Sequence, residues 1–175
     1  MNLHDLKETL PDFAKDVKLN LSSLVAGSDT GGLSLKQLAG TTLACAYASR
    51  NATLIAATEN QVAPLLDAAH FKAAKGAATM MAMNNVYYRF VHLVSDPGFA
   101  ALPAKLRMNF IGGHGIDKID FELYSLAISA LNGCGLCIDS HVVQLKKHGL
   151  SLEAIQMSIR IAAIINSVAQ VLAIS

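Results

Sequence analysis

The chain has 175 residues, enough for one domain with a sizeable core, and its net charge of +1 comes without any basic run. That charge pattern gives no electrostatic footprint for nucleic acid. Hydrophobic residues make up 53% and charged residues 15%, below the usual charged share of about 25%. The excess of apolar surface predicts an interface between copies of the chain.

Neither a secretion signal nor a membrane span is expected. The first residues include Asp and Glu and lack the apolar core of a signal peptide. The most apolar segment, residues 159–175, is interrupted by Arg160, Asn166 and Gln170. It therefore lacks the roughly 18–20 uninterrupted apolar residues that cross a bilayer. We expect a cytoplasmic protein.

Helical spacing of apolar residues runs through almost every segment, and strand-like alternation is absent, which predicts an all-α protein. The first helix is expected over residues 3–25, with a break at Pro11. Ser34 is a candidate N-cap for a helix over residues 35–49. A shorter helix should cover residues 52–62.

The middle of the chain is expected to hold one long helix and then irregular structure. Pro64 suits the first position of a helix that continues to Val94. Residues 95–102 should interrupt the helical pattern, and Pro103 should begin a short helix. The glycines in residues 112–115 predict a turn.

Three further helices complete the pattern, and the second of them begins at the cysteines. Asp117 or Asp120 should cap a helix that ends before Asn132-Gly133, and a new helix should begin near Cys134. Ser151 should open the last helix.

A weak internal repeat relates residues 36–94 to residues 117–175 within a single domain, residues 1–175. Leu43-Ala44 falls on Leu126-Ala127, and each half reads as two helices, a short break and a longer helix. Only the second half carries chemistry, because the positions that match its Cys134, Cys137 and His141 are Asn51, Leu54 and Thr58.

The segment "NGCGLCIDSH", residues 132–141, is the strongest chemical signal. At roughly 100° per residue, Cys134, Cys137 and His141 share one helix face within about 60°. Cys134 stands at the helix start, where free N–H groups and the helix dipole favour a thiolate. The two cysteines can close into a disulfide across one turn.

Other uses of the cysteines fit the sequence less well. A disulfide scaffold needs an oxidising compartment and usually an even, larger cysteine count, whereas this chain has three. A structural zinc site wants four ligands, and no second CxxC or HxxxH is present. Cys45 lies in the apolar run "TLACAYA" and is interpreted as a small buried hydrophobe. The pattern favours redox chemistry, and no metal ligand is assigned.

Glu122 is the only charged residue between Asp120 and Asp139. Its carboxylate stands either at a solvated helix start or, partly buried, beside the thiols, where it could hold or pass a proton. His114 lies between glycines and could line a site, although a plain turn residue is the simpler interpretation.

These residues resemble the active site of the alkyl hydroperoxide reductase D (AhpD) family, in the carboxymuconolactone decarboxylase-like superfamily. The similarity covers nearly the whole chain and includes "LKETLPDFAKDVKLNLSSL", "MAMNNVYYR" and residues 106–141. A CxxC motif alone would be weak. Glu122 twelve residues before Cys134, with His141 four residues after Cys137, is much more specific.

The resemblance implies an AhpD-like helical fold and a role for each site residue. Cys137 would attack the peroxide and become a sulfenic acid. Cys134 would donate a proton and then resolve the sulfenic acid as a 134–137 disulfide. His141 and Glu122 would form a proton relay. In thioredoxin-like proteins the first cysteine of the CxxC motif is the nucleophile, because it lies nearest the helix N-terminus, and here that cysteine would be Cys134. His141 lies one turn from Cys137, however, and favours the family assignment.

The resemblance also implies an antioxidant, thiol-dependent peroxidase that reduces alkyl hydroperoxides and hydrogen peroxide without a bound cofactor. A dihydrolipoyl group on a 2-oxoacid dehydrogenase subunit would reduce its disulfide, the peroxiredoxin AhpC would be a partner, and the chain would form a homotrimer. The alternative is an electron-transfer adaptor that passes electrons from dihydrolipoamide to AhpC. A metal-binding or redox-sensing module is a third hypothesis. The decarboxylase activity of the superfamily is disfavoured, because it does not require the CxxC motif that this chain carries. Some relatives carry histidine where this chain has Leu136.

Overall fold

Residues 1–175 are described by a computed structural model, in which the chain forms helices and no β-strand. The all-α prediction is therefore confirmed. In chain order the elements are α1 (Leu3–Glu8), the 3-10 helix η1 (Asp12–Ala14), α2 (Lys15–Ala26), α3 (Leu35–Ser49), α4 (Ala52–Val62), α5 (Ala68–Leu93), α6 (Gly98–Ala101), α7 (Asn109–Gly112), α8 (Lys118–Leu131), α9 (Gly135–Lys147) and α10 (Leu152–Ile174).

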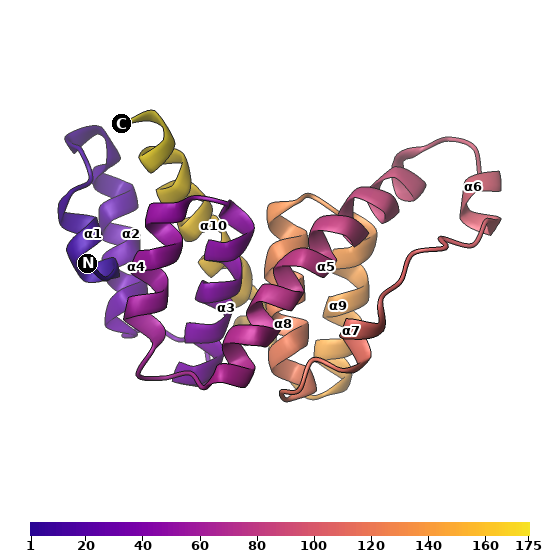
Figure 1. The fold of residues 1–175 in the computed structure, drawn as a ribbon, viewed down its shortest axis with the longest axis horizontal. Helices are drawn as coiled ribbons and strands as arrows, with labels where there is room; N and C mark the ends of the chain where they lie inside the picture. The colour runs from indigo at the N-terminus through magenta and orange to yellow at the C-terminus, as the bar shows by residue number, and fades with distance from the viewer.

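Helices α3 and α8 form the centre of the molecule, because they contact each other and both also contact α5 and α10. Helices α1, α2 and α4 gather at one end together with both chain termini, and α9 lies at the other end against α8 and α5 (Figure 1). Helix α5 thus extends from the central layer to the side of the molecule where α9 begins, at Cys134 and Cys137.

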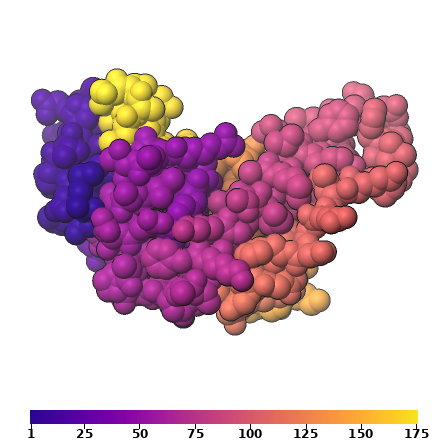
Figure 2. All heavy atoms as spheres, in the orientation of Figure 1, coloured from indigo at the N-terminus to yellow at the C-terminus, as the bar shows by residue number.

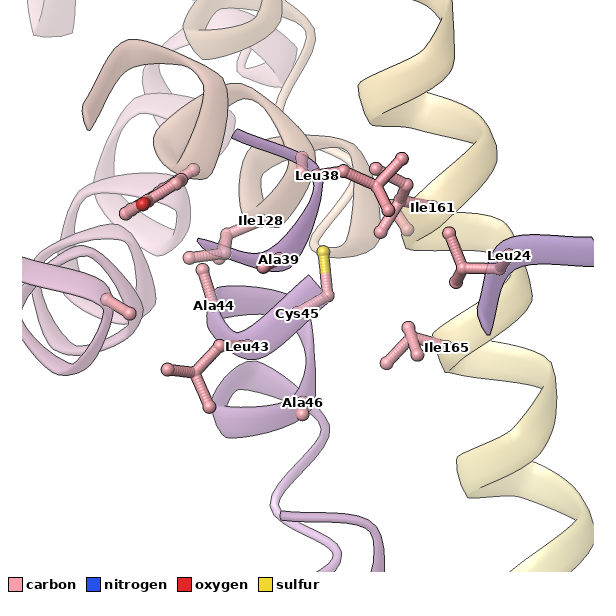
Figure 3. Packing of buried hydrophobic residues seen from close by; sticks show 14 of the residues in the cluster. Leu24, Leu38, Ala39, Leu43, Ala44, Cys45, Ala46, Ile128, Ile161 and Ile165 are labelled. Carbon is pink, nitrogen blue, oxygen red and sulfur yellow. The ribbon is translucent and has the colours of Figure 1, made fainter. Parts of the chain in front are cut away.

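The core around α3 is built from small and branched side chains. Cys45 of α3 is fully buried and lies among residues that include Leu24, Ile161 and Ile165 (Figure 3). This burial raises the pKa of the Cys45 thiol far above its ordinary value. The interpretation of Cys45 as a small buried hydrophobe is therefore confirmed.

Capping residues fix several helix starts where the sequence predicts them. Ser34 caps α3 in a reciprocal capping box with Gln37, and Ser151 caps α10. Asp117, not Asp120, caps α8, so this helix begins at Lys118 and Asp120 lies buried in its first turn. Pro11 separates α1 from the 3-10 helix that precedes α2, as expected from its missing N–H.

Two proline-based predictions are wrong. Helix α5 does not begin at Pro64, because Asp67 accepts a hydrogen bond from the His70 N–H and thereby caps a helix that starts at Ala68. Pro103 begins no helix; residues 103–108 are irregular, and the short helix α6 lies before them. Proline is tolerated at the first position of a helix but does not start one by itself, and the residue before each of these prolines, Ala63 or Leu102, is the C-cap of the preceding helix.

Residues 94–108, here called the arm, project from the rest of the molecule with α6 at the tip (Figures 1 and 2). Their side chains are exposed or half-buried, and none belongs to the core. Several large apolar side chains of the arm and of the adjoining end of α5 are exposed, namely Val86, Phe90, Leu93, Phe99 and Leu102.

Helix α10 is long and apolar enough to cross a membrane by length and composition alone. In the fold it contacts α2, α3 and α8, and Ile161, Ile165 and Val168 on its inner face are fully buried. An amphipathic face of this kind is what a core helix needs, which accounts for the hydropathy of α10 without a membrane.

Candidate active site

The turn between α8 and α9 places Cys134 at the N-cap of α9. Gly133 adopts a positive φ of 67°, which glycine accepts without steric cost, and the chain then turns into the new helix. The Cys134 sulfur accepts a hydrogen bond from the N–H of Cys137 at 3.3 Å. A cysteine therefore occupies the capping position that Ser, Thr, Asp or Asn usually take.

A disulfide joins Cys134 to Cys137, with the two Cα atoms 5.3 Å apart. Such a spacing lies within the range that disulfides require. The two sulfur-bearing residues differ in access, because Cys134 is 0% exposed and Cys137 is 8% exposed. Of the pair, Cys137 is the residue that a molecule from solution can reach.

Glu122 of α8 and His141 of α9 form a close ion pair or charge-assisted hydrogen bond, with His141 Nδ1 2.7 Å from Glu122 Oε2. Their side chains are only 14% and 16% exposed, so Glu122 is not a residue of a solvated helix start. With Nδ1 engaged by the carboxylate, Nε2 is left as the nitrogen that can exchange a proton.

A cavity of about 500 Å³ lies beside this pair and is formed by α5, α7, α8 and α9. Cys137, His141 and Glu122 line it, whereas Cys134 does not. The apolar part of its wall is formed by Met81, Tyr88, Ile111 and Leu136. The remaining lining residues are polar, namely Asn84, Lys118, Ser140 and Gln144.

Comparison with known proteins shows which family this chain resembles. Residues 97–174 match the model of the Carboxymuconolactone decarboxylase family. Proteins named "Alkyl hydroperoxide reductase AhpD" are similar over nearly the full length. The one from Coxiella burnetii (strain Dugway 5J108-111) is 54% identical over 97% of this chain and 96% of its own. The one from Rhodopseudomonas palustris (strain BisA53) is 56% identical over 97% and 92%.

The chain belongs to the AhpD family. A third relative of the same name, from Bradyrhizobium sp. (strain BTAi1 / ATCC BAA-1182), is 55% identical over 97% of this chain and 92% of its own. The family resemblance read from the motifs is thereby confirmed.

Within this AhpD-family chain, the structure brings together all four residues that the sequence singles out, Glu122, Cys134, Cys137 and His141. His114 does not join them at the cavity wall; its ring stacks on Phe121 at 4.3 Å between centroids. Loss of water contact there lowers the pKa of His114, partly offset by the nearby Glu122 carboxylate. His114 lies in the irregular segment between α7 and α8, and the predicted turn over residues 112–115 is wrong in that Gly112 is the last residue of α7.

The part of the cavity that sequence reasoning missed comes from α5. Met81, Asn84 and Tyr88 lie on successive turns of this helix and line the same cavity as Cys137. One signal could have pointed to them: Asn84 and Asn85 stand together in the middle of a long helix, where asparagine is a poor helix former. No group of three or more His, Cys, Asp or Glu side chains could hold a metal ion.

Proposed function

We propose that the protein is an antioxidant, thiol-dependent peroxidase that reduces alkyl hydroperoxides and hydrogen peroxide through the Cys134–Cys137 pair. The observation that carries the proposal is a disulfide of which one sulfur reaches a cavity shared with the His141–Glu122 pair. A nucleophile, a base and a group that orients the base are the components of an activated thiol. The names of the AhpD relatives point to the same substrate class.

In the proposed first step, His141 takes the proton of the Cys137 thiol, and Glu122 stabilises the resulting imidazolium. The Cys137 thiolate attacks the terminal oxygen of the hydroperoxide and the O–O bond breaks. The leaving alkoxide takes the thiol proton of Cys134, so that the products are an alcohol, a sulfenic acid on Cys137 and a thiolate on Cys134. The N–H of Cys137, which points at the Cys134 sulfur at 3.3 Å, is placed to stabilise that thiolate.

In the proposed second step, the Cys134 thiolate attacks the sulfenic sulfur and forms the disulfide. Hydroxide leaves and takes the proton held by His141, giving water. Two thiols and one hydroperoxide are thus converted into one disulfide, one alcohol and one water. The burial of Cys134 is compatible with this second step, because in it the Cys134 sulfur reacts with Cys137 and not with a molecule from solution.

We assign the reduction of the disulfide to an external dithiol, a dihydrolipoyl group carried by a 2-oxoacid dehydrogenase subunit. One lipoyl thiolate would attack the accessible Cys137 sulfur to form a mixed disulfide, and the second lipoyl thiol would release it as a cyclic disulfide. The cycle needs no bound cofactor. A reducing cytoplasm is its natural setting.

The cavity wall supports an organic substituent on the peroxide. Met81, Tyr88, Ile111 and Leu136 offer apolar contact, and the volume far exceeds what hydrogen peroxide requires. Leu136, the position at which some relatives carry histidine, adds to this apolar wall and contributes no proton-transfer group. We expect a higher kcat/KM with alkyl hydroperoxides than with hydrogen peroxide.

An electron-transfer adaptor is the second candidate. Leu136 is 41% exposed and stands between the two cysteines, so a partner such as the peroxiredoxin AhpC could pack on it and present a disulfide to the pair. Peroxide turnover measured with and without AhpC separates the two roles. Turnover that appears only with AhpC would favour the adaptor.

The direct test is turnover of an alkyl hydroperoxide with dihydrolipoamide as reductant. Cys137→Ser should abolish turnover, and unchanged turnover would contradict the assignment. Cys134→Ser should leave a sulfenic acid that cannot be resolved internally and that dimedone labels at Cys137. A dimedone adduct at residue 134 in the Cys137→Ser variant, with activity retained, would reverse the two roles.

We also propose that the chain assembles as a homotrimer through the arm and the adjoining end of α5. Within one chain their apolar side chains are 39–71% exposed, namely those of Val86, Phe90, Leu93, Phe99 and Leu102. Exposed apolar side chains gathered in one region are what subunit interfaces conceal.

A further inference from the structure

Asn84 is the polar residue of the cavity wall whose presence the four-residue site leaves unexplained. It lies in the middle of α5 and is only 6% exposed, yet it faces the cavity that Cys137 and His141 line. Its Oδ1 is buried without a hydrogen-bond partner in the protein. Of the five side chains with such an atom, Asn84 alone lines this cavity.

Burying an amide oxygen without a partner destabilises the folded state, because the group loses its hydrogen bonds to water. Asparagine in a helix interior adds a further cost relative to leucine or alanine. A chain that needed only packing at this position would gain stability from an apolar residue. Unpaired buried groups in native proteins therefore call for a functional explanation.

The neighbouring asparagine shows what a structural role on the same helix looks like. Asn85 donates to Ser129 Oγ at 2.9 Å, and its Oδ1 accepts from Asn132 Nδ2 at 2.9 Å. It ties α5 to the end of α8, directly before the cysteine turn. Asn85 is fully used within the protein, whereas Asn84 lines the cavity with an amide oxygen that has no partner.

We infer that Asn84 binds the hydroperoxide group itself and holds it for attack by Cys137. This inference depends on the proposed peroxidase function. A hydroperoxide has one O–H donor and two acceptor oxygens, and a primary amide offers one acceptor and two donors. A rotation of the amide about its terminal torsion, which is soft in asparagine, lets Oδ1 accept from the terminal O–H while Nδ2 donates to the inner oxygen.

The inner oxygen is the one on which negative charge develops as the O–O bond breaks. A fixed amide donor at that oxygen stabilises the transition state more than the bound peroxide, which raises the rate of attack. Asn84 therefore complements the relay: His141 and Glu122 act on the proton of Cys137, and Asn84 acts on the oxygens that Cys137 attacks.

The experiment separates the oxidation step from the reactivity of the thiol. Reduced wild type and Asn84→Leu are mixed with tert-butyl hydroperoxide, and disulfide formation is followed by rapid quench and mass spectrometry. We expect the second-order rate constant to fall by about 10²-fold. Alkylation of Cys137 by iodoacetamide, which needs no peroxide site, should keep its rate, and the midpoint of thermal unfolding should stay or rise.

Asn166→Leu is the matched control, since Asn166 is also an asparagine in the middle of a long helix but is exposed on α10, outside the cavity. It should leave both rates unchanged. Asn84→Ala, measured in the same way, guards against a folding defect caused by the leucine side chain.

Three results would overturn the inference. The first is oxidation of Asn84→Leu at the wild-type rate, and the second is an equal fall in alkylation, which would place the effect on the Cys137 thiolate. The third is loss of the fold in both Asn84 variants, which would make the residue structural. Failure of the wild-type protein to be oxidised is a different outcome, because it would remove the proposed function as a whole.

Discussion

At the scale of single residues, the contact with Glu122 is what makes His141 a candidate base. The 2.7 Å contact fixes the ring by Nδ1, and the two side chains are largely shielded from solvent. A carboxylate that orients and stabilises an imidazolium is the arrangement that general-base catalysis needs.

Replacing Glu122 by glutamine should keep the hydrogen bond but remove the charge. We expect peroxide-dependent oxidation of Cys137 to slow by roughly 10²-fold, while the fold is retained. The pH–rate profile of wild type and variant, together with circular dichroism, checks this. Glu59→Gln, at a carboxylate of α4 that accepts from Tyr47 outside the site, is the control that should keep the wild-type profile.

The three cysteines should differ sharply in reactivity. Burial raises the pKa of the Cys45 thiol, so this group stays protonated and unreactive at pH 8, whereas thiolates are the species that alkylate. In the reduced, folded protein, iodoacetamide should modify Cys137 and leave Cys45 untouched. Peptide mapping before and after unfolding in guanidinium checks the prediction; rapid labelling of Cys45 in the folded state would contradict it.

At the scale of the helices, close approach depends on two glycines. A Cβ on Gly40 of α3 would lie within 2.7 Å of three atoms of the fully buried Tyr124 side chain. A Cβ on Gly76 of α5 would instead meet the end of the half-buried Phe110 ring, beside the cavity residue Ile111. The first contact has no room to relax, and the second can relax by a movement of α7.

Gly40→Ala should therefore destabilise the fold by about 1–3 kcal/mol, even though alanine is the better helix former. Gly76→Ala should cost less stability but shift Ile111 and alter kcat/KM for bulky alkyl hydroperoxides. Chemical denaturation and steady-state kinetics on both variants separate the two effects. Equal stability losses would argue against this difference.

The start of α5 should respond to acid. Asp67 caps the helix, and the hydrogen bond from the His70 side chain, reinforced by the His70 backbone N–H, lowers the pKa of the Asp67 carboxyl below its ordinary value. A lowered folded-state pKa contributes stability above the unfolded-state value near 4, and that stability is lost as the pH falls through the folded-state value.

Asp67→Asn keeps a capping side chain but cannot ionise. The midpoint of thermal unfolding of the wild type should exceed that of the variant at pH 6, and the difference should shrink as the pH falls below about 4. A difference that does not change between pH 6 and pH 2.5 would show that the carboxylate charge is unimportant there.

At the scale of the whole molecule, the arm and the adjoining end of α5 expose apolar side chains close to one another. Val86, Phe90 and Leu93 are spaced so that they share one face of α5, and 48–71% of each of these residues is exposed. Phe99 packs edge-to-face on Phe90 and extends the same patch. A second copy of the chain would bury this face and remove its contact with water.

The double variant Phe90→Glu, Leu93→Glu should convert the proposed trimer into monomers, because two carboxylates would have to be buried unpaired in the interface. Light scattering after size-exclusion chromatography measures the mass directly. Phe13→Glu, at an exposed phenylalanine of the opposite end, should leave the mass unchanged. A monomeric wild type would reject the assembly.

Local signals made most of the fold predictable. Ser34, Asp117, Cys134 and Ser151 begin helices where the sequence places them, because an N-cap and the first turn lie within four residues of each other. The shared face of Cys134, Cys137 and His141 follows from the pitch of a single helix. The repeat of residues 36–94 in residues 117–175 stays a prediction; Asn51 and Cys134, matched by it, cap α4 and α9 respectively.

Packing decided what no local pattern encodes. Glu122 and His141 are nineteen residues apart and meet only because α8 and α9 lie side by side. The sequence left open whether Glu122 is solvated and did not mark Asn84. It assigned Cys137 over Cys134 only through the family resemblance and the one-turn spacing to His141. Which sulfur faces the cavity, and which polar side chain is left unpaired beside it, depends on how four helices enclose a space, since burial belongs to their joint packing and not to any one segment.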